Sequence, residues 1–442
     1  MARAIRDGTA WPSAIDMISE PLILLVMVAV FVGGCFLAKL PVALSLVLAS
    51  MAGALSGGEG IPLRHMVEGT FGFLDTNIVI ASAMVFMKVL QHTGVMDTLG
   101  RQIIEAFYSR PSLLLIALML LIMFPGMITG SSTACVFTTG AMVAPVLLHL
   151  GIPRLTTAAI LAIGAMLGMI APPVCIPAMI IGEGIDMPYV GFFFYLLILT
   201  FPLGIVLVLA MGRRHVRRGV EISSLLEKLP PSLYNRYGFK LYLPLALLFL
   251  LMVIPKALPR YVYDPGLPFD FMAATGVGLF TGRRVNVLKV AREAMREAVP
   301  VMGILVGVGM FIQIMTLTGA RGFFVGEALG LSKALLLTAV AFTMPVFGAV
   351  SAFGSASVLG VPFALALLGK DQILTVSALA LVSSLGDLMP PTALAGIFAA
   401  KVLEVENYFH VLRRCLLPAG AILATGILAL VYANWVGRLL PW

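Results

Sequence analysis

Two stretches of similar sequence decide the fold of this chain. The first reads FPGMITGSST at residues 124–133, continues through Ala144-Pro145 and ends with LGMIAPP at residues 167–173. The second reads MPVFGAVSAFGSAS at residues 344–357, continues through Val361-Pro362 and ends with LGDLMPP at residues 385–391. A Thr-Gly pair precedes each stretch, at residues 93–94 and 318–319. The matched order and spacing predict an internal repeat.

The composition places both repeats in a membrane. Of the 442 residues, 60% are hydrophobic and only 11% are charged, whereas a soluble domain carries about 25% charged residues. The mean hydropathy is +1.05, and apolar runs of about 20 residues, long enough to span a bilayer, recur along the chain. In lipid, every backbone polar group must form its hydrogen bonds within the protein, and an α-helix provides these bonds within one segment. The sequence therefore predicts an all-α polytopic membrane protein.

The polar segments predict how the chain is divided and oriented. The net charge is +8, and because the basic residues lie in short loops between apolar runs, we interpret them as topology signals. The most basic loop, residues 212–240, is then cytoplasmic, and Arg283–Arg296 predicts an amphipathic helix at the membrane surface. We expect these regions: an N-terminal segment (1–20), scaffold helices (21–75), a first repeat (76–211), the cytoplasmic loop (212–240), scaffold helices with a surface arm helix (241–298), and a second repeat (299–442).

Each repeat contains an apolar run that is too long for one span and is interrupted by small residues. These runs, 112–150 and 332–368, are predicted to be re-entrant hairpins, since most basic residues then fall on the cytoplasmic side. The first hairpin opens from the cytoplasm and the second from outside, so the repeats are inverted. Inverted repeats with broken helices are typical of secondary transporters, whose binding sites lie near the middle of the membrane.

The interruptions supply the candidate binding groups. A proline inside a helix removes a backbone N–H and leaves carbonyls one turn earlier without partners, and such carbonyls suit Na⁺. Small residues and hydroxyls at the hairpin tips, where helices begin, favour an anion such as a carboxylate. The candidates at the breaks are Gly168, Pro172, Pro173, Gly386, Pro390, Pro391 and Thr392, and those at the tips are Gly130, Ser131, Ser132, Thr133, Ser351, Gly354, Ser355 and Ser357.

Two ionisable residues fall inside the apolar runs, where charge is rarely kept without a function. Asp387 precedes the second proline pair and is predicted to ligate Na⁺ or to carry a proton; the alternative is a carboxylate facing water at the mouth of the break. Lys88 lies within a span, where it either reaches the interface or pairs with a partner chain; a direct role in substrate binding is a further alternative. The expected coupling ion is Na⁺, with H⁺ as the alternative, and no other cofactor is expected.

The sequence gives little support to other classes of function. The five histidines are scattered, and the chain contains no HExxH, GxSxG or P-loop motif, so we expect no enzyme and no nucleotide-driven pump. A passive channel does not need two occluding hairpin tips. The four cysteines lie in or beside apolar runs without a CxxC pair, which is typical of small core residues.

The Gly-Ser-Ser tip at residues 130–132, the Ile-Pro-Arg loop at 152–154, and the Gly and Pro-Pro pattern of both breaks resemble a known family. It is the large permease (DctM-like) subunit of tripartite ATP-independent periplasmic (TRAP) transporters, in the ion-transporter superfamily, and the resemblance runs from about Pro21 to Trp435. It implies an elevator-type symporter of the bacterial inner membrane that imports an organic acid, such as a dicarboxylate, with Na⁺. It also implies two partners, a small four-helix membrane subunit and a periplasmic solute-binding protein.

The sequence departs from the family pattern at the presumed ion sites. Val174 follows the first proline pair where the family usually has Ser, and Met389, Thr392 and Ala393 replace the residues usual around the second pair. Asp387 is also unusual there. The alternative is therefore a stand-alone carrier of the same superfamily that works without a binding protein.

Overall fold

The computed structural model describes residues 19–216, 229–258 and 260–439, and within them it contains helices and no β-strand. Seven of the described helices are long and apolar enough to cross a membrane, which confirms the all-α polytopic membrane fold. The basic residues Arg217, Arg218 and Lys228 of the predicted cytoplasmic loop lie outside the described residues, as do residues 1–18.

The first repeat has the predicted hairpin and the predicted broken helix. The interrupted apolar run forms a hairpin with its tip at Gly130–Ser132, and the next run breaks at Pro172-Pro173. The elements are α4 (Leu74–Thr93), α5 (Val95–Phe107), α6 (Pro111–Thr129), α7 (Ser132–Cys135), a π-helical turn (Val136–Gly140), α8 (Ala141–His149), α9 (Arg154–Ile170), α10 (Ile176–Gly184) and α11 (Phe192–Gly212).

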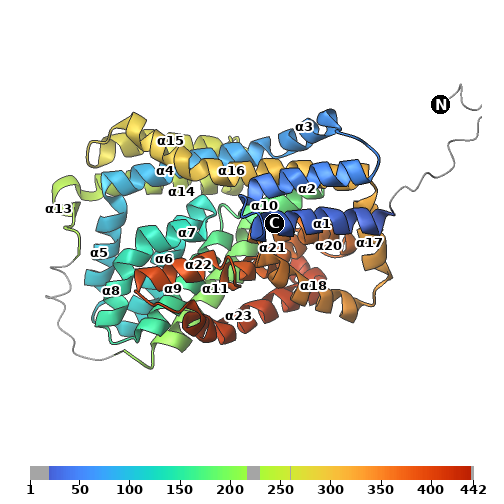
Figure 1. Cartoon of the computed structure of the whole chain (residues 1–442). Helices are drawn as coiled ribbons and strands as arrows, with labels where there is room; N and C mark the ends of the chain where they lie inside the picture. Colours follow the sequence, from blue (N-terminus) through green and yellow to red (C-terminus); the bar gives the residue numbers. More distant parts are fainter. Residues whose placement is uncertain (1–18, 217–228, 259, 440–442) are drawn as a thin grey trace, which may run out of the picture.

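The second repeat has the same elements in the same order, with one additional 3₁₀ turn at its break. They are α16 (Val287–Leu317), α17 (Ala320–Gly330), α18 (Lys333–Gly348), α19 (Ala352–Ser355), a π-helical turn (Ala356–Gly360), α20 (Val361–Ala366), α21 (Gln372–Ser384), a 3₁₀ turn (Leu385–Leu388), α22 (Leu394–Val402) and α23 (Tyr408–Val431). Gly94 and Gly319 adopt positive φ values of 82° and 75° and end α4 and α16. Hairpin 1 (α6–α8) and hairpin 2 (α18–α20) lie at opposite ends of the molecule (Figure 1), so the repeats are inverted.

Helices α1, α2, α3, α14 and α15 form a layer along one side of the repeats (Figure 1). In this layer α1 and α2 pack on each other and α2 on α16, while α14 and α15 pack on each other and α15 on α4. Their bounds, with those of the short helices, are α1 (Glu20–Phe36), α2 (Val42–Ser56), α3 (Leu63–Gly72), α13 (Tyr234–Tyr237), a 3₁₀ turn (Gly238–Tyr242), α14 (Leu243–Ala257), α15 (Leu267–Thr281) and α24 (Ala433–Leu439).

The prediction of a separate surface helix over Arg283–Arg296 is wrong. Helix α16 begins at Val287 and runs without interruption to Leu317, with Pro300 inside it. A proline removes one N–H from a helix, and membrane helices tolerate this where neighbouring groups satisfy the freed carbonyl. The basic segment is therefore the first part of a long helix that continues as the span predicted from residue 299.

Close helix crossings fix the position of both hairpins. A Cβ on Gly168 of α9 would lie 2.5 Å from the Met123 carbonyl oxygen of α6, and a Cβ on Gly386 would overlap the backbone of Gly348 at the end of α18. Only glycine permits such backbone contact. Both candidate break glycines thus have a packing role, which brings each hairpin tip up to a broken helix.

The two repeats exchange their half-helices. Helix α22 of the second repeat packs on α9 and on hairpin 1, whereas α10 of the first repeat packs on hairpin 2 and α21. The rings of Phe137 in hairpin 1 and Phe398 in α22 lie 4.8 Å apart between centroids. The surroundings of each hairpin are therefore built from both repeats.

Candidate functional site

Serines cap the short helices that begin at the two hairpin tips. The Ser131 side chain accepts a hydrogen bond from the Ala134 N–H (3.3 Å), and the Ser351 side chain accepts one from the Gly354 N–H (3.2 Å). Such N-caps satisfy N–H groups that a helix start leaves open. The Thr133 hydroxyl lies 2.8 Å from the Ser131 hydroxyl. These residues therefore let the chain turn back into a helix inside the membrane.

The other two serines predicted at the tip of hairpin 2 are directed into that hairpin. The buried Ser355 hydroxyl donates to the Met344 carbonyl oxygen (2.7 Å), and the buried Ser357 hydroxyl donates to the Gly354 carbonyl oxygen (3.0 Å). These bonds join the two arms of the hairpin and its turn. Ligand binding by these two serines stays a prediction.

Each proline break is fastened to the neighbouring hairpin. The Val174 N–H donates to the Met127 carbonyl oxygen (3.0 Å), and the Thr392 hydroxyl donates to the Ala349 carbonyl oxygen (2.7 Å). Met127 follows Gly126, which contacts the Gly168 backbone, and Ala349 follows Gly348, which contacts the Gly386 backbone. The departures from the family pattern at residues 174 and 392 thus take part in equivalent contacts. The peptide bonds of both proline pairs, Pro172-Pro173 and Pro390-Pro391, are cis.

The carbonyl groups at the breaks are already partly used. The Gly168 carbonyl oxygen accepts from the Ala171 N–H (3.2 Å), and the Gly386 carbonyl oxygen accepts from the Met389 N–H (2.9 Å). A carbonyl oxygen has two lone pairs, so one remains for a cation at each position. The described residues contain no group of three or more His, Cys, Asp or Glu side chains that could hold a metal ion. Na⁺ binding by these carbonyls stays a prediction.

Sequence reasoning missed a tyrosine at each break. The Tyr189 hydroxyl donates to the Pro173 carbonyl oxygen (3.1 Å) and accepts from the Cys175 N–H (3.2 Å). The Tyr408 hydroxyl donates to the Leu388 carbonyl oxygen. The available signal was a tyrosine at a similar distance after each proline pair.

The second break meets the tip of hairpin 1. The Ser132 hydroxyl donates a hydrogen bond to the Asp387 carboxylate. Only 5% of Asp387 and 3% of Ser132 are exposed, so the carboxylate does not face water. A buried charge needs a hydrogen-bonding partner, and here the partner comes from the opposite repeat. A carboxylate, a hydroxyl and nearby carbonyls are oxygen donors of the type that a hard cation accepts.

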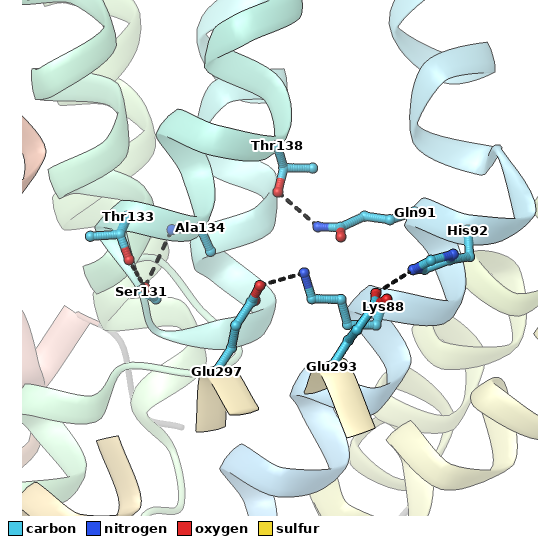
Figure 2. Close-up of polar contacts among 9 residues, drawn as sticks. All are labelled: Lys88, Gln91, His92, Ser131, Thr133, Ala134, Thr138, Glu293 and Glu297. Carbon is cyan, nitrogen blue, oxygen red and sulfur yellow. Dashed lines mark hydrogen bonds and ion pairs between the residues drawn. The ribbon is translucent and has the colours of Figure 1, made fainter. Parts of the chain in front are cut away.

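The tip of hairpin 1 also borders a cavity of about 650 Å³. In it the Lys88 ammonium forms an ion pair of 2.6 Å with the Glu297 carboxylate of α16, and the Gln91 amide donates to the Thr138 hydroxyl (2.7 Å), as Figure 2 shows. Lys88 is therefore paired within the chain. The lining residues are Met84, Lys88, Gln91, Met96, Asp97, Ser131, Thr133, Ala134, Phe137, Thr138, Glu297, Pro300 and Val301.

The tip of hairpin 2 is packed instead. A Cβ on Gly354 would lie 3.0 Å from the Phe31 ring of α1, and the Phe31 and Phe347 rings stack with centroids 5.7 Å apart. Scaffold helix α1 thus covers one hairpin tip, while the other tip borders open space between α4 and α16.

Comparisons with known proteins agree with this architecture. The crystal structure of the Alcanivorax borkumensis YdaH transporter, described as having an unusual topology, superposes with a TM-score of 0.63 over 92% of this chain and 98% of that one. At 14% sequence identity this similarity shows the fold alone. Comparison with curated protein sequences finds no match. Residues 27–436 match the family described as the DctM component of the tripartite ATP-independent periplasmic transporter. The chain therefore belongs to the DctM family of TRAP transporter components, which are multi-pass membrane transport proteins.

Proposed function

We propose that this chain imports a small organic acid, such as a dicarboxylate, across the bacterial inner membrane by symport with Na⁺. It does so together with a small four-helix membrane subunit and a periplasmic solute-binding protein. The observation that carries the proposal is the buried contact between Asp387 and Ser132. A cation bound at this contact neutralises the carboxylate and holds the tip of hairpin 1 against the second break. Ion binding is thereby coupled to the state of the substrate-bordering hairpin.

The asymmetry of the two tips supports an elevator movement. Hairpin 1 borders the cavity, whereas hairpin 2 lies against Phe31 of the scaffold. In an inverted repeat, sliding the hairpins and broken helices past the scaffold exchanges these two environments. The substrate site then opens to the cytoplasm in the arrangement described here and to the outside after the movement.

The partners follow from the family and from two features of the chain. The described outer connections are short: the segment predicted as a loop at 319–332 is mostly helix α17, and 258–266 joins α14 to α15. Neither forms a domain that captures dilute substrate. Helices α1 and α2 expose leucines along one face, to which a helical subunit can pack; they are Leu22, Leu25, Leu44, Leu48 and Leu55.

Reconstitution tests this function. Proteoliposomes containing the chain, with and without the small subunit and the binding protein from neighbouring genes, are assayed for uptake of labelled organic acids under an inward Na⁺ gradient. We expect concentrative uptake only with all three components. Full concentrative uptake by the chain alone, unaffected by either partner, would identify the alternative, a stand-alone carrier.

The role of the ion site is tested with Asp387→Asn. This variant should weaken the Na⁺ dependence of uptake far more than it lowers protein abundance, because the cation loses its only charged ligand at the contact. Asp264→Asn, at a carboxylate in an outer loop, is the matched control. Unchanged Na⁺ dependence in Asp387→Asn would show that the carboxylate is structural.

A further inference from the structure

The geometry points to Lys88 as the residue that anchors a substrate carboxylate in the cavity beside hairpin 1, with Glu297 as an internal carboxylate that occupies this position until substrate arrives. This inference rests on the proposed function and assigns its substrate contact to the scaffold helix α4. The Lys88 side chain lies in a span and is only 14% exposed, whereas its partner Glu297 is 51% exposed.

The difference in exposure decides which partner can be exchanged. An ammonium at membrane depth needs a counter-ion, so Lys88 must keep a carboxylate partner. Glu297 is half in open space and can turn away into water. A substrate carboxylate presents the same chemical group and can therefore take its place without leaving Lys88 unpaired.

The other cavity groups suit an organic acid. Ser131, Thr133, Gln91 and Thr138 line the cavity with neutral hydrogen-bonding groups, which suit the hydroxyl or carbonyl groups of such a molecule. The remaining charged group in the lining is Asp97, whose carboxylate interacts electrostatically with Arg283. Once Glu297 is displaced, Lys88 is the cation that an incoming anion meets.

The inverted repeat shows that the fold does not require this charge. With Thr93-Gly94 aligned to Thr318-Gly319, the equivalent of Lys88 is the neutral Gln313. The crossing of α3 with α16 near Gln313 is closed by backbone contact between Gly69 and Gly309.

At the crossing of α4 with α16, the positions equivalent to these two glycines are Ala294 and Met84. Met84 lines the cavity. One crossing is thus closed by glycines, whereas the other carries larger residues and has an ion pair and a cavity beside it.

A second side-chain contact between the same two helices provides the control. His92 and Glu293 lie 2.7 Å apart, one turn from Lys88 and Glu297 (Figure 2), but neither lines the cavity. Glu293→Gln therefore removes a similar interhelical contact without changing the cavity wall.

The test measures carboxylate affinity from ligand-induced thermal stabilisation of the purified full-length chain in Na⁺ buffer. The probes are succinate, lactate and glutamate. Lys88→Gln should weaken the affinity of the preferred probe by about tenfold or more, the scale of one charge-assisted hydrogen bond. Glu297→Gln should strengthen it several-fold because the internal competitor is gone, and Glu293→Gln should leave it unchanged. The double variant Lys88→Gln/Glu297→Gln leaves no unpaired charge and should also bind weakly, which separates lost binding from misfolding.

Failure of this inference is distinguishable from failure of the proposed function. If no probe stabilises the unmodified chain at saturating concentration, the proposed carboxylate specificity is wrong. If a probe binds the unmodified chain and the double variant equally well, or if Glu297→Gln binds no tighter than Glu293→Gln, Lys88 is only part of a structural pair.

Discussion

The contact between Ser132 and Asp387 makes a quantitative prediction about hairpin 1. Both side chains are buried, and a hydrogen bond to a charged group contributes about 1.5–3 kcal/mol, against about 1 kcal/mol for a neutral one. Ser132→Ala should therefore favour opening of the tip by about 10- to 150-fold, at 1.4 kcal/mol per tenfold. In the Asp387→Asn background, Ser132→Ala should favour opening of the tip by only about fivefold.

The native Cys135 provides the assay. It is fully buried in hairpin 1, one turn from Ser132, so a thiol reagent reaches it only when the tip opens. Alkylation rates are measured in a chain that retains Cys135 alone, for the four combinations of the two substitutions. A second chain that retains only Cys415, which is fully buried in α23, reports on opening elsewhere.

We expect Ser132→Ala to accelerate the alkylation of Cys135 strongly when Asp387 is present and weakly when Asn replaces it. The alkylation rate of Cys415 should change by no more than about twofold, which is the size of effect expected from a neutral surface substitution. Equal acceleration in both backgrounds would show that the two residues are not coupled. Equal acceleration of Cys135 and Cys415 would show that the serine change destabilises the whole chain. Either outcome would refute the role given to this contact.

Three further predictions concern orientation and packing. Ser232→Cys should be protected from an impermeant thiol reagent in intact cells and Asp264→Cys labelled, because the positive-inside rule predicts that the basic loop is cytoplasmic; the reverse pattern would overturn the inverted topology. Gly386→Ala should lower the abundance of folded protein, since its Cβ overlaps the α18 backbone and overpacking destabilises by about 1–3 kcal/mol, whereas Gly276→Ala, with open space around it, should not. Tyr189→Phe should lower the stability of the chain by about 1 kcal/mol through loss of its hydrogen bonds at the first break, and unchanged thermal unfolding would contradict this.

The sequence by itself determined the class, the repeats and the places where helices break. Apolar run length depends on bilayer thickness, and glycine, serine and proline act on the backbone within a turn of their own position. For this reason the tip at residues 130–132 and the breaks at both proline pairs were predicted without tertiary information. The surface helix predicted over Arg283–Arg296 instead continues through Pro300 as part of α16, because membrane helices tolerate a proline where neighbouring groups satisfy the freed carbonyl.

Only the tertiary structure decided which distant residues meet. Ser132 and Asp387 are 255 positions apart, and Lys88 is separated from Glu297 by most of the first repeat and by the scaffold helices α14 and α15. No local pattern fixes such pairs, because they depend on how the repeats exchange half-helices and on how closely two helices approach at each crossing. The sequence could place a charge in the membrane at Lys88, but its partner, its cavity and the closed glycine crossing opposite it follow from packing alone.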